Sequence, residues 1–267
     1  KDNEENVDSE TLEVKWDSLT MKIYDGDRLI RTLKQKAPKE SGIQKWMWPS
    51  LNEKGPDRPT RKIRKSTREP SGTKVKPGKY KLVLHFGDKT SEKMLTVKSD
   101  PRLNIPENAI NEVYNASKVL ETLTQITSDA VKQLAESKQI VDKYQSELKK
   151  LDKEKYKDAI KSCKDITKSI DALLDMYLGK VDKRQGITRN SEMTISRRIN
   201  LANGYVKSRQ NGLTTTETTL INHAEKAVKD GIEKTNTFFN EDWKSFRNNI
   251  EKLNISIFKD IKTFKLN

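Results

Sequence analysis

The residues best suited to binding chemistry lie in a basic stretch and just before it. Between residues 54 and 76, lysine and arginine outnumber aspartate and glutamate, and such a stretch would neutralise phosphate or sulfate groups in a salt-dependent way. Two tryptophans precede it, and their flat indole rings suit the apolar faces of sugars. The residues that we predict as polyanion or glycan contacts are Trp46, Trp48, Arg58, Arg61, Lys62, Arg64, Lys65 and Arg68.

The same residues also have a structural explanation. Lysine and glutamate are interspersed through most of the chain, so the basic stretch is also what a solvated surface would show. Trp46 and Trp48 are two positions apart and would share one face of an extended segment, which favours core packing. Aromatic residues do not alternate with the basic ones, and no nucleic-acid motif is present. Glycan or polyanion binding is therefore our second hypothesis, and nucleic acid is not an expected partner.

Residues for metal binding or covalent catalysis are sparse. The two histidines, His85 and His223, fall in different predicted domains, and a zinc site needs several closely spaced ligands. Cys163 lies on the apolar stripe of a predicted helix with no histidine nearby, which indicates a core residue rather than a nucleophile. No glycine-rich phosphate loop is present. We predict no catalytic residue, no metal site and no cofactor, and no enzymatic activity in this chain.

Length and composition favour two domains. The chain has 267 residues, of which 33% are hydrophobic and 34% charged, and this is polar for one compact globule. Trp16, Trp46 and Trp48 all fall in the first fifth, so composition shifts along the chain. The formal net charge is +14, and a single cysteine excludes an intramolecular disulfide. No apolar run approaches the ~20 residues of a membrane-spanning helix, so we expect no membrane span.

The first hundred residues show strand patterns. Alternation at Leu19, Met21 and Ile23 predicts a strand, and a turn at residues 25–27 leads to a return strand at 29–33. A third strand is predicted from Ile43 to Trp48. Four prolines then predict a long loop over residues 49–76. Strands on either side of Gly87-Asp88 form a closing hairpin. These elements predict a small antiparallel β-sandwich over residues 11–101, with residues 1–10 as a disordered linker.

After residue 101 the apolar spacing becomes helical. A helix of about 45 residues is predicted to run to Asp152, with a second stripe after a short break. Asn190 or Ser191 could cap a third helix, and the Thr214 to Glu217 spacing is that of a capping box. Each helix has one apolar stripe, so we expect an antiparallel bundle of about four helices over residues 102–267. The spacing also permits self-association as a coiled coil, and we expect the tail at 254–267 to pack back on the folded chain.

Several short motifs together resemble a known family. They are Met21-Lys22-Ile23-Tyr24-Asp25, Leu29-Ile30-Arg31-Thr32-Leu33, Gly42 with the tryptophan segment, Pro77-Gly78-Lys79-Tyr80, Leu95-Thr96-Val97 and Asp100-Pro101-Arg102. This pattern resembles the Ig-like domain related to that of the flagellar hook-capping protein. The form it resembles follows the β-propeller of large bacterial sortilin-like, BNR-repeat "glycosyl hydrolase" proteins. In those proteins an Asp-Pro-Arg leads from the Ig-like domain into a C-terminal helical region.

The resemblance implies a non-catalytic role. The family's propeller, where any catalytic or ligand site would lie, is not part of this chain, so we carry over no catalytic residue. The resemblance implies an exported protein, periplasmic, on the cell surface or secreted. Its expected partners are the upstream β-propeller of the same parent protein and other proteins or glycans. Our first hypothesis is therefore a structural and protein-interaction C-terminal region. The basic stretch at residues 54–76 departs from the family pattern and keeps the second hypothesis open.

Overall fold

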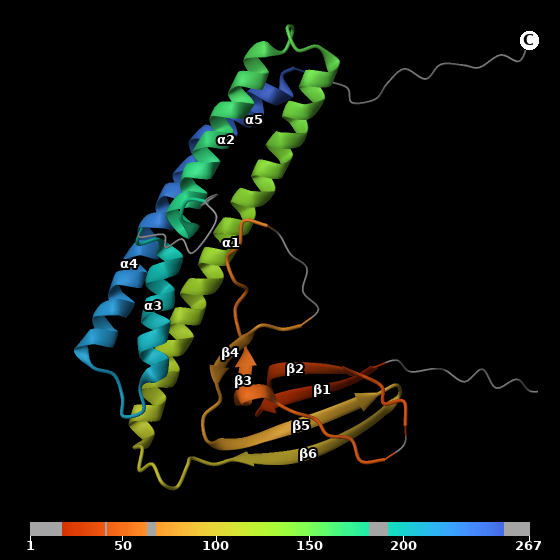
Figure 1. Cartoon of the computed structure of the whole chain (residues 1–267), viewed down its shortest axis with the longest axis vertical. Coiled ribbons are helices and arrows are strands. Elements are labelled where there is room, and N and C mark those ends of the chain that lie inside the picture. The colour runs from red at the N-terminus through yellow and green to blue at the C-terminus, as the bar shows by residue number, and fades with distance from the viewer. Residues whose placement is uncertain (1–17, 41, 63–67, 182–191, 254–267) are drawn as a thin grey trace, which may run out of the picture. The chain divides into compact units, whose positions relative to one another are not determined.

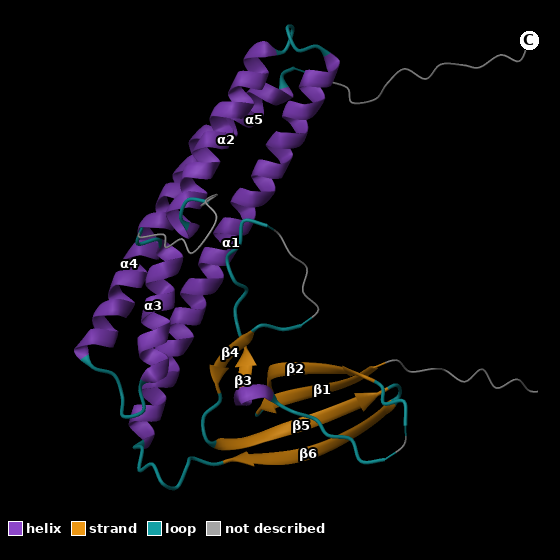
Figure 2. Ribbon diagram, viewed as in Figure 1, coloured by secondary structure: helices purple, strands orange, loops and turns teal. Residues whose placement is uncertain are grey.

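The computed structural model describes residues 18–40, 42–62, 68–181 and 192–253. The chain divides into two compact units, which we call the β unit and the helical unit (Figures 1 and 2). The β unit comprises residues 1–54 and 67–101, and the helical unit comprises residues 55–66 and 102–267. The predicted linker at 1–10 and the predicted docking of the tail at 254–267 fall on residues outside the described ranges. The mixed class is confirmed: a small antiparallel sheet is combined with four long helices in the described part.

Among the described residues, the β unit contains a four-stranded antiparallel sheet in the order β2-β1-β5-β6. Its strands are β1 (Ser18–Asp25), β2 (Arg28–Lys36), β5 (Gly78–Phe86) and β6 (Lys89–Val97). A separate two-stranded ladder pairs β3 (Asn52–Lys54) with β4 (Ser71–Lys74). Both predicted hairpins are confirmed. Their turns place Gly26 and Gly87 at φ values of 59° and 58°, a conformation that residues other than glycine rarely adopt.

The predicted third strand is wrong. Residues 43–48 are not in a strand, and the predicted loop at 49–76 contains the 3₁₀ turn η1 (Pro49–Leu51) together with β3 and β4. The tryptophan alternation marks packing instead of strand pairing. Trp48 meets Tyr80 edge to face at 5.8 Å between ring centroids, and its indole N–H donates to the carbonyl of Asn52 at 2.9 Å. These contacts hold the segment at Trp48 against the sheet just before the chain enters η1 and β3.

A β-bulge in β2 shapes the core of the β unit. Ile23 of β1 pairs with Arg31 and Tyr24 pairs with Leu29, so Ile30 is an extra residue in β2. As a result, the neighbours Ile30 and Arg31 are both buried, beside a fully buried Ile23. The Arg31 guanidinium donates to the carbonyl oxygens of Glu53 at 3.1 Å, Glu69 at 3.1 Å and Pro70 at 2.5 Å. These bonds engage the two terminal nitrogens of a cation that would otherwise be costly to bury, while its Nε atom has no partner among the described residues.

The helical unit is built along one long helix, α1 (Glu107–Leu151), which has 45 residues and a length of about 68 Å. The other helices are α2 (Lys157–Leu178), α3 (Ile195–Ser208) and α4 (Thr215–Phe238), and α4 continues through the π-helical turn η2 (Phe239–Trp243) into α5 (Lys244–Glu251). In Figure 1, α2 and α3 lie along different parts of α1. No helix in the described ranges has the length and apolarity needed to cross a membrane.

The apolar stripes of these helices meet in one core, as the sequence predicts. Fully or almost fully buried members include Leu120, Val131, Leu134, Val141, Leu148, Cys163, Ile170, Tyr177, Ile199, Ala202, Val206, Ala224 and Val228. One buried hydrogen bond joins α2 to α4, between the Tyr177 hydroxyl and Thr235 Oγ1 at 2.9 Å. Gly231 of α4 allows the start of α3 to approach closely, because a Cβ atom there would lie 2.4 Å from the Cδ1 atom of Ile195.

The start of α4 is fixed by a buried carboxylate. The predicted capping box is confirmed: the backbone N–H and the hydroxyl of Thr214 donate to Glu217 Oε2 at 2.8 and 2.5 Å. Arg209, just after α3, pairs with the same carboxylate at 2.8 Å. The Thr214 hydroxyl and then the Arg209 guanidinium lower the pKa of Glu217 from 4.5 to about 2. For α3 the cap is Thr194, which accepts from the N–H of Arg197, while Asn190 and Ser191 lie outside the described residues.

Substitution of Glu217 by glutamine is expected to destabilise the helical unit in a pH-dependent way. A carboxyl whose folded pKa is lowered contributes stability above its unfolded pKa, and this contribution is lost as the pH falls through the folded pKa. The gap in urea midpoint between the wild type and Glu217→Gln should therefore be widest at neutral pH and shrink between pH 4.5 and about 2. Circular dichroism at a series of pH values measures it. Glu225→Gln, at an exposed position of α4, is the matched control, and a gap that stays constant with pH would contradict the assignment.

Candidate binding groove on the β unit

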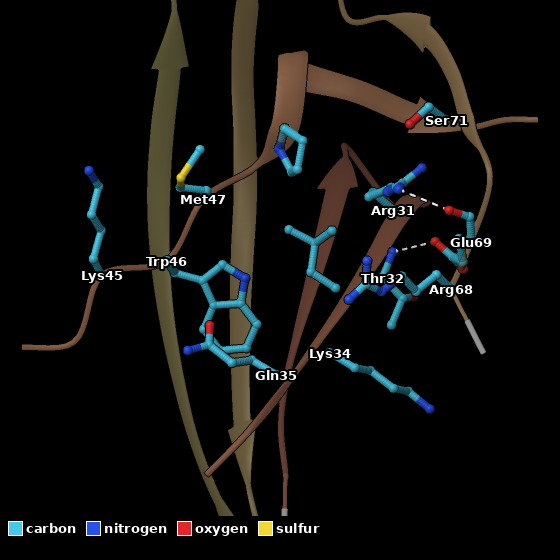
Figure 3. A pocket seen from close by; sticks show the side chains of 12 residues that line it. Arg31, Thr32, Lys34, Gln35, Lys45, Trp46, Met47, Arg68, Glu69 and Ser71 are labelled. Atoms are coloured by element: carbon cyan, nitrogen blue, oxygen red, sulfur yellow. Dashed lines mark hydrogen bonds between the residues drawn. The ribbon is translucent and has the colours of Figure 1, made fainter. Parts of the chain in front are cut away.

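An open groove of about 790 Å³ lies beside β2 (Figure 3). One wall is β2 itself, from Arg31 to Gln35. The rest is formed by residues 45–47 with Pro49, and by Arg68, Glu69 and Ser71. All of these residues belong to the β unit. The volume is in the range of sites that bind small molecules or short peptide segments.

The groove exposes a free sheet edge. β2 is the outer strand of the sheet, and the N–H of Thr32 points away from β1 and donates to Glu69 Oε2 at 2.8 Å. In an antiparallel ladder, every second residue directs both its N–H and its C=O outward. Lys34 therefore directs both groups outward at the groove, and neither has a hydrogen-bond partner among the described residues.

The charge of the groove is positive. Lys34, Lys45 and Arg68 line it, against the single carboxylate of Glu69, which already accepts from the Thr32 N–H. Arg31 also borders the groove, but backbone carbonyls occupy its guanidinium. The local field therefore attracts anionic groups.

Apolar side chains complete the groove. Trp46 is half-buried and projects into it, and Met47 is 65% exposed (Figure 3). Leu33 and Pro49 add further apolar surface. The groove therefore combines a strand edge, positive charge and an aromatic ring, which are elements of a binding site.

The predicted contact residues separate into different environments. Trp46 and Arg68 line the groove, whereas Trp48 packs in the core beneath it. Arg58 and Lys62 are exposed in the helical unit, and Arg64 and Lys65 lie outside the described residues. The sequence prediction missed Lys34 and Lys45. A weak signal was present at the end of β2, where Lys34-Gln35-Lys36 interrupts the apolar alternation.

The segment at 55–62 belongs with the helices. Arg61 pairs with Asp175 of α2 at 2.5 Å and donates to the carbonyl of Gly179 at 2.6 Å. The backbone N–H of Asp57 donates to the Gln125 side chain of α1 at 3.1 Å. Part of the basic stretch is therefore a structural attachment, and Arg61 is engaged within its own unit.

Other reactive groups occupy structural positions. Cys163 is fully buried in α2, and burial raises the pKa of its thiol to about 11, so the thiol is protonated at neutral pH. Within the described ranges, no group of three or more histidine, cysteine, aspartate or glutamate side chains is placed to hold a metal ion. A second hollow of about 560 Å³ is lined by one helical face, at Phe239, Asn240, Trp243, Lys244, Arg247 and Asn248.

Comparison of the sequence with protein-family models gives no match, and comparisons with curated proteins and with solved structures give none either. The family resemblance therefore stays a prediction that depends on the motifs quoted for it.

Replacement of Arg61 by alanine is expected to release the segment at 55–62 from the helical unit. The substitution removes two charge-assisted hydrogen bonds, and its cost should be on the order of 1–2 kcal/mol. Hydrogen–deuterium exchange should show faster amide exchange at residues 55–62 and around Gly179. Arg58→Ala removes the same type of side chain from an exposed position of the same segment and should leave exchange unchanged. Equal effects of the two substitutions would contradict the role assigned to Arg61.

Proposed function

We propose that this chain is a non-catalytic structural and protein-interaction region. The observation that carries the proposal is the groove at β2, where an exposed strand edge lies beside cationic and aromatic side chains. In the helical unit, by contrast, groups with reactive chemistry hold helices together: Glu217 caps α4, and Tyr177 joins α2 to α4.

We also infer the context that the resemblance implies. The chain would be the C-terminal region of an exported, BNR-repeat propeller protein, with the upstream propeller as its partner. The β unit would be an Ig-like sandwich, in which the β3–β4 ladder contributes to a second layer. Two observations support this inference. Buried residues such as Glu53 and Thr73 lie in that ladder, and Asp100-Pro101-Arg102 stands between the end of β6 and the start of α1.

Binding of a glycan or polyanion is the alternative, and the groove supplies a specific reason for it. Trp46 and Arg68, both predicted as contacts from the sequence, line the same groove, and Lys34 and Lys45 add positive charge. A sulfated sugar could stack on the indole ring and pair with these cations. Such binding would weaken steeply with salt.

The leading proposal predicts binding without turnover. The purified chain should bind a separately expressed propeller, encoded upstream of Lys1, with a Kd on the order of micromolar, as is typical of interfaces between domains. Isothermal titration calorimetry measures this affinity. The chain alone should hydrolyse no chromogenic glycoside. Turnover that disappears on substitution of one carboxylate would overturn the non-catalytic role, and an upstream reading frame without BNR repeats would overturn the propeller context.

A further inference from the structure

The groove at β2 has the features of a site for an extended peptide. We propose that it binds an acidic, extended segment of a partner protein, which adds to the sheet as a new edge strand beside Leu33–Lys36. This inference rests on the proposed protein-interaction function and names its site and the chemistry of its partner. Strand addition draws its affinity from main-chain hydrogen bonds and its selectivity from alternate side chains.

The open part of the edge is defined by what closes the rest. Arg31 binds the carbonyls of Glu53 and Pro70, and Thr32 gives its outward N–H to Glu69. These bonds occupy the first half of β2. Beyond Thr32, the outward N–H and C=O of Lys34 are the next pair in the ladder, and they have no partner within the described ranges. An added strand would therefore begin where the bonds to Glu69 end.

Charge selects the partner. The Glu69 carboxylate already binds this edge by accepting from the Thr32 N–H. Three cationic side chains also line the groove, those of Lys34, Lys45 and Arg68. An acidic segment would be drawn toward these cations, whereas a basic segment would be repelled. The groove thus favours aspartate or glutamate in the bound strand.

Apolar contacts set the pattern of that strand. Successive side chains of a strand point to opposite faces of the sheet. On β2, Leu33 is packed against the core of the β unit, on the face that Trp48 covers, and Lys34 points to the other face. Every second residue of the bound segment should therefore be apolar and meet Leu33 and Trp46, with acidic residues between.

A sulfated glycan fits fewer of these observations. It would use the cations and the indole ring, but it does not offer the repeating N–H and C=O pair that matches the outward groups of Lys34. The peptide uses all three features together, so we favour it.

The test uses the full chain and a capped, fluorescein-labelled peptide of about six residues in which glutamate alternates with valine. Fluorescence anisotropy should show saturable binding. Trp46→Ala, or the double variant Lys34→Glu/Lys45→Glu, should weaken it by about tenfold or more. Arg58→Glu/Lys62→Glu changes the charge equally outside the groove and should change affinity less than about twofold. Circular dichroism confirms that each variant is folded.

A backbone variant of the peptide tests strand addition on the wild-type chain, so no question of folding arises. Methylation of alternate peptide nitrogens keeps the side chains and removes the donors that would meet the carbonyl oxygens of β2, and it should abolish binding. Undiminished binding of the methylated peptide would overturn the proposal. So would equal binding of a lysine–valine peptide, or no binding of the glutamate–valine peptide.

Two controls separate this inference from its alternatives. A heparin hexasaccharide that binds more tightly than the peptide, with the same dependence on Trp46 and Lys34, would overturn the peptide in favour of the glycan. If the groove variants bind the separately expressed propeller as well as the wild type does, while the peptide does not bind, the inference fails and the proposed function stands. If the wild-type chain does not bind the propeller at all, the proposed function fails instead.

Discussion

The arrangement of the β unit depends on one buried guanidinium. Arg31 is 8% exposed, and it donates to backbone carbonyls of Glu53, Glu69 and Pro70, which lie far from it along the chain. The bulge at Ile30 places Arg31 on the inner face, and the three bonds hold β3 and the segment before β4 against β2. Because that segment is fixed, Glu69 can reach the Thr32 N–H, and the groove acquires its second wall. The shape of the groove is therefore a consequence of the bonds that the Arg31 guanidinium makes.

The helical unit solves a similar problem with a carboxylate. Glu217 is fully buried, and its partners Thr214 and Arg209 belong to the connection between α3 and α4. Apolar stripes along helices can slide or rotate with little change in buried area, whereas a buried charge has few positions in which its hydrogen bonds are met. Glu217, together with the Tyr177–Thr235 bond, therefore favours one register of the helices.

The sequence predicted those elements that depend on local signals. The bounds of α1 follow from apolar spacing after Pro106, and the two hairpins follow from Gly26 and Gly87. Alternation at Trp46 and Trp48 predicted a strand that does not form, because alternation reports which side of a segment is covered and not whether a neighbouring strand pairs with it. The strand β3, Asn52–Lys54, has little intrinsic β-propensity and pairs through tertiary contacts. In the same way, Trp46 and Arg68 were recognisable as contacts, but Lys34 and Lys45 join them only once the register of β2 is known. The attachment of residues 55–62 depends on Arg61 and Asp175, which are 114 positions apart.

The lysines on β2 have a second physical meaning that fits the first. Lysine on an edge strand is a common way to prevent two copies of a protein from pairing edge to edge. Lys34 and Lys36 would repel the same edge of another copy, whereas β6, at the other edge of the sheet, carries both signs side by side at Glu92 and Lys93. The same positive charge that repels this edge of a second copy of the protein would attract an acidic strand. With Trp46 beside it, this edge is selective as well as protected. Its charge repels basic segments, and the indole ring favours a bound strand with an apolar side chain at the position that contacts it.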